Sequence, residues 1–214
     1  STYNNWKINF MNLLSSLERS KDEYISQIKY DLDWLGIDYD ETFNQSSRFD
    51  RYREQFEKLK ADGRIYPCYE TPEELERKRK LLIAAGGKQV YDRSAMELTD
   101  QQKKDYEAEG RKPHWRFLLK TERMKWDDLL KGEIDIDLTS LSDPVLFRED
   151  GVPLYTFSSA VDDIDYGITN VIRGDDHTSN TAVQVEIINA LDQNKITFAH
   201  HALLKASSLS LIHI

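Results

Sequence analysis

The densest group of side chains that could bind a ligand is the turn at positions 173–177, which reads Arg-Gly-Asp-Asp-His. It directly follows Ile168–Arg173, an apolar stretch typical of a strand. In open α/β sheets, ligands bind beyond the carboxyl ends of strands, where helix N-termini offer free N–H groups. Arg173 could grip a carboxylate or a phosphate with two parallel hydrogen bonds, and His177 could contact a base. A solvated polar turn explains the same spacing equally well.

Three further groups could carry chemistry, and each has a simpler structural explanation. Acids at positions 162, 163 and 165 could bind Mg²⁺ or act as acid and base, although helix ends often carry such residues. Cys68 has no obvious base beside it, so we expect a small buried apolar side chain rather than a nucleophile. His200 and His201 are consecutive, and consecutive strand residues face opposite sides of a sheet, which argues against a shared metal.

The segment 111–125 is basic, although the chain as a whole is acidic. The chain has 29 Lys+Arg against 38 Asp+Glu, a formal net charge of −9, which argues against nucleic-acid binding. Within the segment, six cations oppose one acid, with aromatic residues between them. Such a strip suits phosphate contact and base stacking, and one solvated face of a hairpin explains it equally well. The cations are Arg111, Lys112, Arg116, Lys120, Arg123 and Lys125.

The elements that must position these residues can be predicted from capping signals and apolar spacing. Helices are expected over about 20–36, 48–63, 71–86 and 99–110, each ending near a glycine. The expected capping pairs are Ser20 with Glu23, Thr71 with Glu74 and Thr99 with Gln102, and the second helix has an apolar stripe of Phe49, Tyr52, Phe56 and Leu59. Strands are expected at 114–119, 133–137 and 145–157, the last of them turning at Asp150-Gly151. The mixture of helices and strands after residue 64 indicates an α+β insertion.

From residue 158 the pattern alternates between helix and strand. We expect a short helix at Ala160–Asp165 and then the strand Ile168–Arg173. A helix capped by Thr181 with Gln184 and a last strand at Ile196–Leu204 should follow. Strand, polar turn, helix and strand form the βαβ unit of a doubly wound sheet, so the predicted fold class is α/β.

Composition excludes several classes of protein. A chain of 214 residues with 39% hydrophobic residues can bury a core, which argues against disorder. The longest nearly apolar run, Leu81–Ala85, is far shorter than the ~20 residues of a membrane span, so no membrane partner is expected. The single cysteine, Cys68, excludes an intrachain disulfide and a multi-cysteine zinc site, and it favours a cytoplasmic location.

Several longer motifs resemble one family closely and in uninterrupted order from about residue 17 to 205. They are Leu17–Ser20, Trp34–Gly36, Arg48–Tyr52, Tyr69–Leu75, Asp143–Tyr155, Val161–Asp163, Gly167–His177, Asn180–Thr181 and Gln184. The family is bacterial glutamyl-tRNA synthetase. The resemblance implies a class I synthetase that activates L-glutamate with ATP and Mg²⁺ and transfers it to the 3′ end of tRNA(Glu). The parent enzyme is expected to be monomeric and cytoplasmic.

The resemblance also implies a fold and a set of site residues. The expected fold is an incomplete Rossmann-type catalytic domain, 1–63 and 158–214, split by an acceptor-binding insertion at 64–157. No residue of this chain is matched to a catalytic or metal-binding position. The matched positions are Tyr155, Ser159 and Arg173 for glutamate, Asp176 and His177 for ATP, and Arg111, Lys112 and Arg116 for the tRNA acceptor arm.

The sequence departs from the family pattern at both ends. The His-Ile-Gly-His-type motif and the Lys-Met-Ser-Lys-Ser-type loop are absent, as are the cysteine-rich zinc motif and an anticodon-binding domain. We interpret the chain as an internal fragment, with atypical sequence before about residue 17 and foreign sequence at 206–214. The isolated fragment is therefore expected to be inactive and to hold no zinc. The alternative is a non-catalytic module that binds the tRNA acceptor arm.

Overall fold

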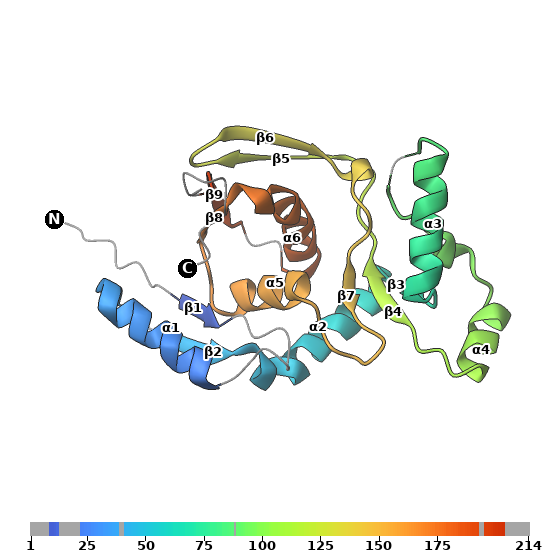
Figure 1. The fold of residues 1–214 in the computed structure, drawn as a ribbon, viewed down its shortest axis with the longest axis horizontal. Helices are drawn as coiled ribbons and strands as arrows, with labels where there is room; N and C mark the ends of the chain where they lie inside the picture. Colours follow the sequence, from blue (N-terminus) through green and yellow to red (C-terminus); the bar gives the residue numbers. More distant parts are fainter. Residues whose placement is uncertain (1–8, 13–21, 39–40, 88, 193–194, 204–214) are drawn as a thin grey trace. The chain divides into compact units, whose positions relative to one another are not determined.

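The computed structural model describes residues 9–12, 22–38, 41–87, 89–192 and 195–203. The chain divides into two compact units, residues 1–54 and 55–214. Figure 1 shows the helices and strands of each unit. No helix in the described ranges is long and apolar enough to cross a membrane.

The first unit pairs two short parallel strands, with a helix between them in sequence. Strand β1 (Asn9–Asn12) pairs with β2 (Glu41–Asn44), and α1 (Asp22–Leu35) connects them. Helix α1 ends as predicted, because Gly36 adopts a φ of 67° that suits a residue without Cβ. A short 3₁₀ turn, η1 (Gln45–Arg48), leads into α2 (Phe49–Ala61).

The second unit begins within α2 and continues into a three-stranded antiparallel sheet. Its strands are β3 (Ile65–Cys68), β4 (His114–Phe117) and β7 (Val145–Phe147), in the order β3-β4-β7. Phe56 of α2 is buried against this sheet, with its ring 5.1 Å from Trp115 and 4.6 Å from Phe147. The predicted apolar stripe of α2 is therefore confirmed at this position.

Two helices and a 3₁₀ turn connect β3 to β4. They are α3 (Pro72–Ala84), η2 (Ser94–Glu97) and α4 (Asp100–Ala108). The two capping boxes predicted in this segment are present: Thr71 pairs with Glu74, and Thr99 pairs with Gln102. The predicted Ser20–Glu23 pair lies outside the described residues. These helix starts were predictable because each cap involves residues only three positions apart.

A long hairpin follows β4. It consists of β5 (Arg123–Asp128) and β6 (Gly132–Asp137), followed by the 3₁₀ turn η3 (Leu138–Ser140). The sequence predicted β6 but not β5. The backbone N–H of Leu129, in the hairpin turn, donates to the carbonyl of Phe198 at 2.9 Å, so the hairpin is joined to a strand much later in the chain.

The predicted strand at 145–157 is wrong in its second half. Strand β7 stops at Phe147, and the Asp150-Gly151 turn forms as expected, with a φ of 79° at Gly151. The chain then enters α5 (Tyr155–Asp165), which starts five residues before the predicted helix. All six residues at 157–162 are buried, so this run is enclosed on several faces rather than alternating between two. Tertiary burial therefore overrides the strand-like sequence.

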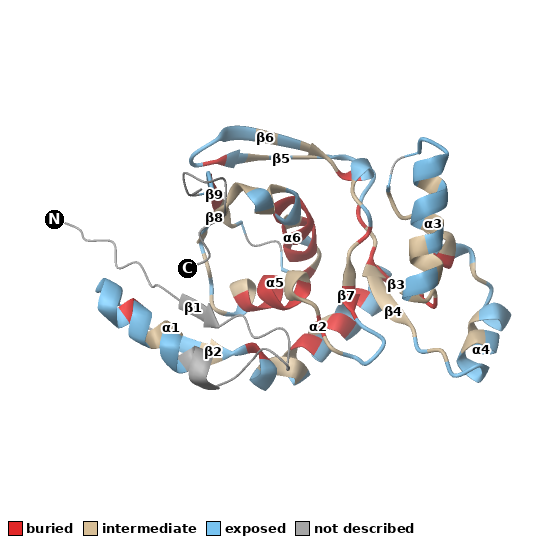
Figure 2. Ribbon diagram, in the orientation of Figure 1, coloured by how far each residue is buried: buried red, intermediate tan, exposed pale blue. Residues whose placement is uncertain are grey.

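The predicted βαβ unit is confirmed. Strand β8 (Asn170–Gly174), the turn η4 (Asp175–His177), α6 (Thr178–Leu191) and β9 (Thr197–His201) follow in order, and β8 pairs with β9 in parallel. Figure 2 shows α5 and α6 as largely buried helices. Helix α6 begins at Thr178, so the predicted cap at Thr181 is wrong: Thr181 and Gln184 lie buried within the helix.

Candidate functional site

Arg173 lies near the carboxyl end of β8, and its side chain hydrogen-bonds to α6. One guanidinium nitrogen, Nη1, donates to Gln184 Oε1 at 2.5 Å, and Nη2 donates to Thr181 Oγ1. The guanidinium carbon lies 5.4 Å from the centre of the Phe198 ring on β9. Both hydrogen-bond partners are neutral, so they orient the guanidinium without cancelling its charge. The residues that the sequence assigned to a helix cap are those that hold this arginine.

Two buried polar atoms near this strand end lack a hydrogen-bond partner within the described part of the chain. They are the Nε of Arg173 and the Oγ of Ser159. Ser159 lies one helical turn after Tyr155 on α5, so both side chains share a face of that helix. Burial lowers the pKa of Arg173, whereas interactions with Tyr155 favour its charged form. The structure thus brings Tyr155 to Arg173.

The acidic trio contains one unusual carboxyl group. Burial, reinforced by the charge of Asp162, raises the pKa of Asp163 to about 7, while Arg173 acts in the opposite direction. Asp162 is buried and Asp165 is exposed, so the three acids do not form one cluster. Asp163 can therefore gain or lose a proton near neutral pH, close to the guanidinium of Arg173.

Asp176 and His177 lie in η4, directly after the end of β8. Their side chains approach each other, with Asp176 Oδ2 3.8 Å from His177 Nε2. A Cβ on Gly174 would lie 2.4 Å from Asp176 Oδ1, so only glycine fits this position without moving that carboxylate. Asp175 instead pairs with Lys131 of the hairpin turn at 2.9 Å. The turn is thus an ordered structure rather than a freely solvated loop.

A buried chain of polar side chains, which the sequence analysis missed, lies behind Arg173. His200 Nδ1 is 2.5 Å from Asp128 Oδ2, and His200 Nε2 is 2.6 Å from Thr181 Oγ1. Asp128 Oδ1 also accepts the backbone N–H groups of Leu130, Lys131 and His200. Burial opposes its charge, but these hydrogen bonds prevail and lower the pKa of Asp128 to about 2.

Only part of this buried chain could have been found in the sequence. His200 is buried and His201 is exposed, so the prediction that the two histidines face opposite sides is confirmed. Asp128 and His200 lie 72 residues apart, however, and no local spacing relates them.

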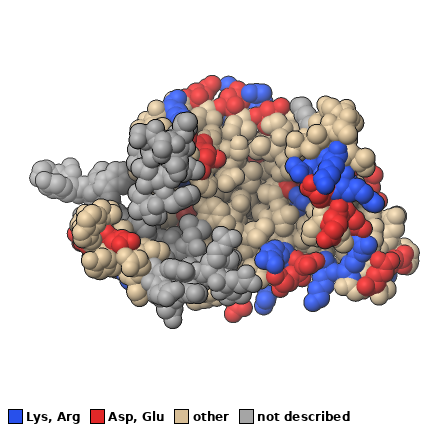
Figure 3. Space-filling view, viewed as in Figure 1, with Lys and Arg blue, Asp and Glu red and all other residues tan. Residues whose placement is uncertain are grey.

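Most cations of the basic segment 111–125 form ion pairs with acidic side chains of the same chain. Arg111 pairs with Glu74 at 3.0 Å, and Arg116 donates to the carbonyl of Asp143 at 2.7 Å. Lys112 is exposed. Figure 3 shows cationic and anionic side chains interspersed rather than a continuous positive surface. The other pairs are Lys120 with Glu122, Arg123 with Asp135, and Lys125 with Glu133.

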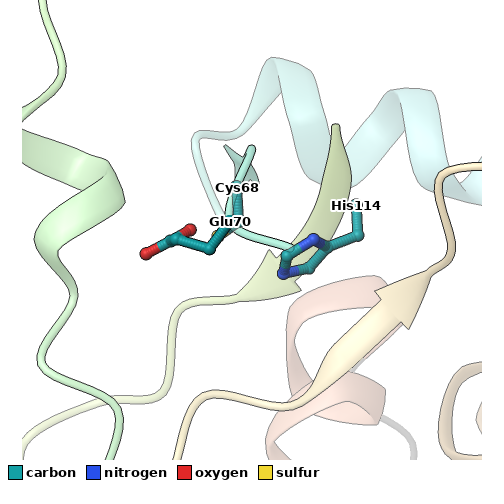
Figure 4. Close-up of side chains that lie close together, drawn as sticks. All are labelled: Cys68, Glu70 and His114. Carbon is teal, nitrogen blue, oxygen red and sulfur yellow. The ribbon is translucent and has the colours of Figure 1, made fainter. Parts of the chain in front are cut away.

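A second cluster brings together Cys68, Glu70 and His114 (Figure 4), whose ligand atoms all lie within 4.8 Å of one another. Cys68 is fully buried, as predicted, and burial raises the pKa of its thiol to about 12. Burial, with help from the charge of Arg116, lowers the pKa of His114 to about 4. Lys78 lies 3.2 Å from Glu70, so a cation already accompanies this carboxylate. A single cysteine excludes a multi-cysteine zinc site, but it does not exclude a cluster of mixed metal-ligating side chains such as this one.

With this geometry described, the comparisons with known proteins decide the family. Residues 15–212 match the family described as tRNA synthetases class I (E and Q), catalytic domain. The chain belongs to this family. It is 54% identical over 190 residues to glutamate–tRNA ligase 1 of Maricaulis maris, covering 89% of this chain and 43% of that protein. It is also 54% identical over 196 residues to glutamate–tRNA ligase 2 of Beijerinckia indica, covering 91% and 44%.

Solved structures of the family agree with the fold. A glutamate tRNA ligase from Elizabethkingia meningosepticum, in complex with its amino acid, matches with a TM-score of 0.81 at 25% identity, covering 93% of this chain and 42% of that one. The glutamate-tRNA synthetase of Elizabethkingia anophelis matches with a TM-score of 0.82 at 26% identity, covering 92% and 43%. This chain therefore has the α/β fold of a class I synthetase catalytic domain, and it spans less than half the length of these relatives.

Proposed function

We propose that this chain is the part of a glutamate–tRNA ligase that binds L-glutamate and ATP and meets the acceptor arm of tRNA(Glu). The relatives named above support the reaction: ATP activates glutamate, and the glutamyl group then passes to the 3′ end of the tRNA. The proposed division of labour is a catalytic domain formed by 1–63 and 158–214, with 64–157 as the acceptor-binding insertion.

The observation that carries the proposal is the incomplete hydrogen bonding of Arg173. Its guanidinium is oriented by Gln184 and Thr181, yet its Nε has no partner among the described residues. A planar guanidinium with a free edge suits a carboxylate, which can accept two parallel hydrogen bonds. We assign the carboxylate of glutamate to this edge, with Tyr155 beside it and the buried hydroxyl of Ser159 as a further contact.

Asp176 and His177 are proposed to contact the adenosine of ATP. They follow the strand that carries Arg173, at the carboxyl end where nucleotides bind in this class of fold. Lys131 holds Asp175, and Gly174 leaves room for Asp176, so the turn is fixed before a nucleotide arrives. When bound, Mg²⁺ would stabilise the phosphate charges of ATP.

For the tRNA, we propose that Lys112 makes the freest phosphate contact of the three predicted residues. It is exposed, whereas Arg111 and Arg116 are occupied within the chain. The Arg111 side chain is partly exposed, so a tRNA phosphate could bind it by displacing Glu74. Arg116 instead supports the sheet through Asp143, and its contribution to tRNA binding would be indirect.

The test is glutamate-dependent ATP–pyrophosphate exchange by the full-length protein that contains this segment. Exchange should require glutamate, and Arg173→Ala should raise the glutamate KM strongly while leaving the ATP KM nearly unchanged. The expected cost is about 2–4 kcal/mol, because the carboxylate stays desolvated without its partner. Loss of ATP affinity with intact glutamate affinity would instead assign Arg173 to the phosphates.

A further inference from the structure

We propose that Asp128, His200 and Thr181 form a relay that positions Arg173 for the glutamate carboxylate. This inference rests on the proposed function of Arg173 and adds three positioning residues to it. None of the three is assigned a contact with substrate; they act through the arginine.

The order of donors and acceptors in the relay follows from elementary valence. Asp128 is ionised and can only accept, so His200 Nδ1 must carry the proton between them. The guanidinium can only donate, so Thr181 Oγ1 accepts from Arg173. The single proton of the Thr181 hydroxyl has two acceptors within reach, His200 Nε2 at 2.6 Å and the His177 carbonyl at 3.2 Å. With the ring proton on Nδ1, we assign the hydroxyl proton to the nearer acceptor, Nε2. Every bond then points one way, from Arg173 through Thr181 and His200 to Asp128.

The relay fixes the arginine from several elements at once. Arg173 and His200 are register partners on β8 and β9, Thr181 comes from α6, and Asp128 ends β5 of the hairpin. Asp128 and His200 have fully buried side chains. Hydrogen bonds in such a dry environment are stronger than in water, and directed chains reinforce one another. A movement of the β5–β6 hairpin would therefore displace Asp128 and, through His200 and Thr181, the guanidinium of Arg173.

The arrangement also preserves the positive charge that a carboxylate ligand needs. A carboxylate in direct contact with Arg173 would neutralise it and compete with the substrate. Within the relay, the Asp128 carboxylate stands two side chains away, behind an imidazole and a hydroxyl, and Gln184 supplies a second neutral contact. Asp163 and Asp176 also favour the charged form of Arg173, but no hydrogen bond joins either of them to it among the described residues. The guanidinium is thus held by neutral contacts, and its Nε has no partner among the described residues.

A purely structural role for the same residues makes a different prediction, and two substitutions of Thr181 separate them. Thr181→Val keeps the shape but removes the hydroxyl, whereas Thr181→Ser keeps the hydroxyl and loses a buried methyl group. In the full-length protein, Thr181→Val should raise the glutamate KM by about ten- to a hundredfold, the effect expected for a hydrogen bond to a charged group. The ATP KM should not change. Thr181→Ser should bind glutamate nearly normally, even where urea unfolding shows it to be the less stable variant.

His201→Ala serves as the matched control, because His201 is the exposed neighbour of His200 on the same strand. Its glutamate KM should stay unchanged. If both Thr181 variants changed the two Michaelis constants together, in proportion to lost stability, the relay would be only a packing feature. If Arg173→Ala itself spared glutamate binding, the proposed pocket would be wrong whatever Thr181 does.

A measurement on the unaltered chain keeps the relay testable if the valine variant does not fold. Nitrogen NMR of ¹⁵N-histidine-labelled protein distinguishes the two ring nitrogens, and His200 should be neutral, with its proton on Nδ1. A His200 with its proton on Nε2 would reverse the direction of the bonds and overturn the proposal.

Discussion

Two charged groups in the second unit, Asp143, which is buried, and Arg173, which is partly buried, differ in how completely their hydrogen bonds are satisfied. The carboxylate of Asp143 accepts two bonds from Arg93, at 2.8 and 2.9 Å, one from the Tyr66 hydroxyl at 2.6 Å and one from the backbone N–H of Leu119 at 3.0 Å. Arg173 has two partners for its terminal nitrogens and none for its Nε among the described residues.

Under the proposed function, this difference separates a structural charge from one that binds a ligand. The Asp143 carboxylate joins η2 to the β3-β4-β7 sheet and offers no free lone pair to a substrate. Burial and hydrogen bonding to Asp143 raise the pKa of Tyr66, so the phenol stays a donor. Arg173 is oriented by Gln184 and Thr181, but its Nε has no partner among the described residues. The Nε of Arg116 also lacks a partner among the described residues, so the missing partner of Arg173 gains meaning only from its place at the strand end beside Tyr155 and Ser159.

The largest expected effect comes from breaking the complete network. Asp143→Ala should lower the free energy of unfolding by about 3–5 kcal/mol, because it leaves the Arg93 guanidinium without its anion. Urea unfolding followed by circular dichroism measures this loss. Glu57→Ala, at an exposed position of α2, is the control and should change stability by less than about 0.5 kcal/mol. A loss at Asp143 no larger than the control would remove the distinction between the two networks.

Substitutions at Arg173 should change glutamate binding strongly and the free energy of unfolding only a little. Arg173→Met should cost only about 1–2 kcal/mol of unfolding free energy, since the groups that it hydrogen-bonds, Thr181 and Gln184, are neutral. In the full-length protein the same change should abolish measurable saturation by glutamate. Tyr155→Phe should raise the glutamate KM by a smaller factor, because a neutral hydroxyl contributes less than a guanidinium. A stability loss at Arg173 that matches Asp143→Ala would contradict the comparison.

Asp163 offers a pH-dependent version of the same test. Its pKa is raised from 3.8 to about 7 in the folded chain, chiefly by burial, so the folded state holds a proton that the unfolded state releases. Stability should therefore fall as pH rises from about 4 to about 7, by about 2 kcal/mol between pH 5 and pH 7. Asp163→Asn should remove this slope. Parallel urea curves for both proteins at pH 5 and pH 8 check it; identical pH dependence would show that Asp163 is ionised throughout.

The smallest expected effect concerns the exposed cation of the basic segment. Lys112→Ala should reduce the slope of log affinity against log salt for tRNA by about one unit, as for one lost phosphate contact. Arg116→Ala should change stability instead, because that side chain holds the carbonyl of Asp143. Filter binding at several salt concentrations measures the slope. An unchanged slope for Lys112→Ala would leave the segment as a solvated face.

The sequence predicted the features that depend on near neighbours. The Thr71–Glu74 and Thr99–Gln102 boxes and the turn at Gly151 formed as expected, because each is decided within a few residues. The predicted strand through Tyr155 failed because burial on several faces, which no short pattern reveals, favours a helix there.

The candidate site divides in the same way. Arg173 at a strand end was predictable from the pattern of its own strand and turn, and the resemblance supplied Tyr155 and Ser159. Thr181 and Gln184 were assigned to a cap because they have the right spacing for one, yet both face the guanidinium. Their role depends on the packing of α6 against β8, which appears only in three dimensions.

The contact between Asp128 and His200 also sets an order of events during synthesis. The hairpin leaves the ribosome first, and its partner on β9 follows only 72 residues later. Until then the Asp128 carboxylate has its own turn's N–H groups and water, but no imidazole. The arginine at the end of β8 thus gains its final support only when β9 docks. A nascent chain that pauses before β9 would lack the imidazole that stands between Asp128 and Thr181.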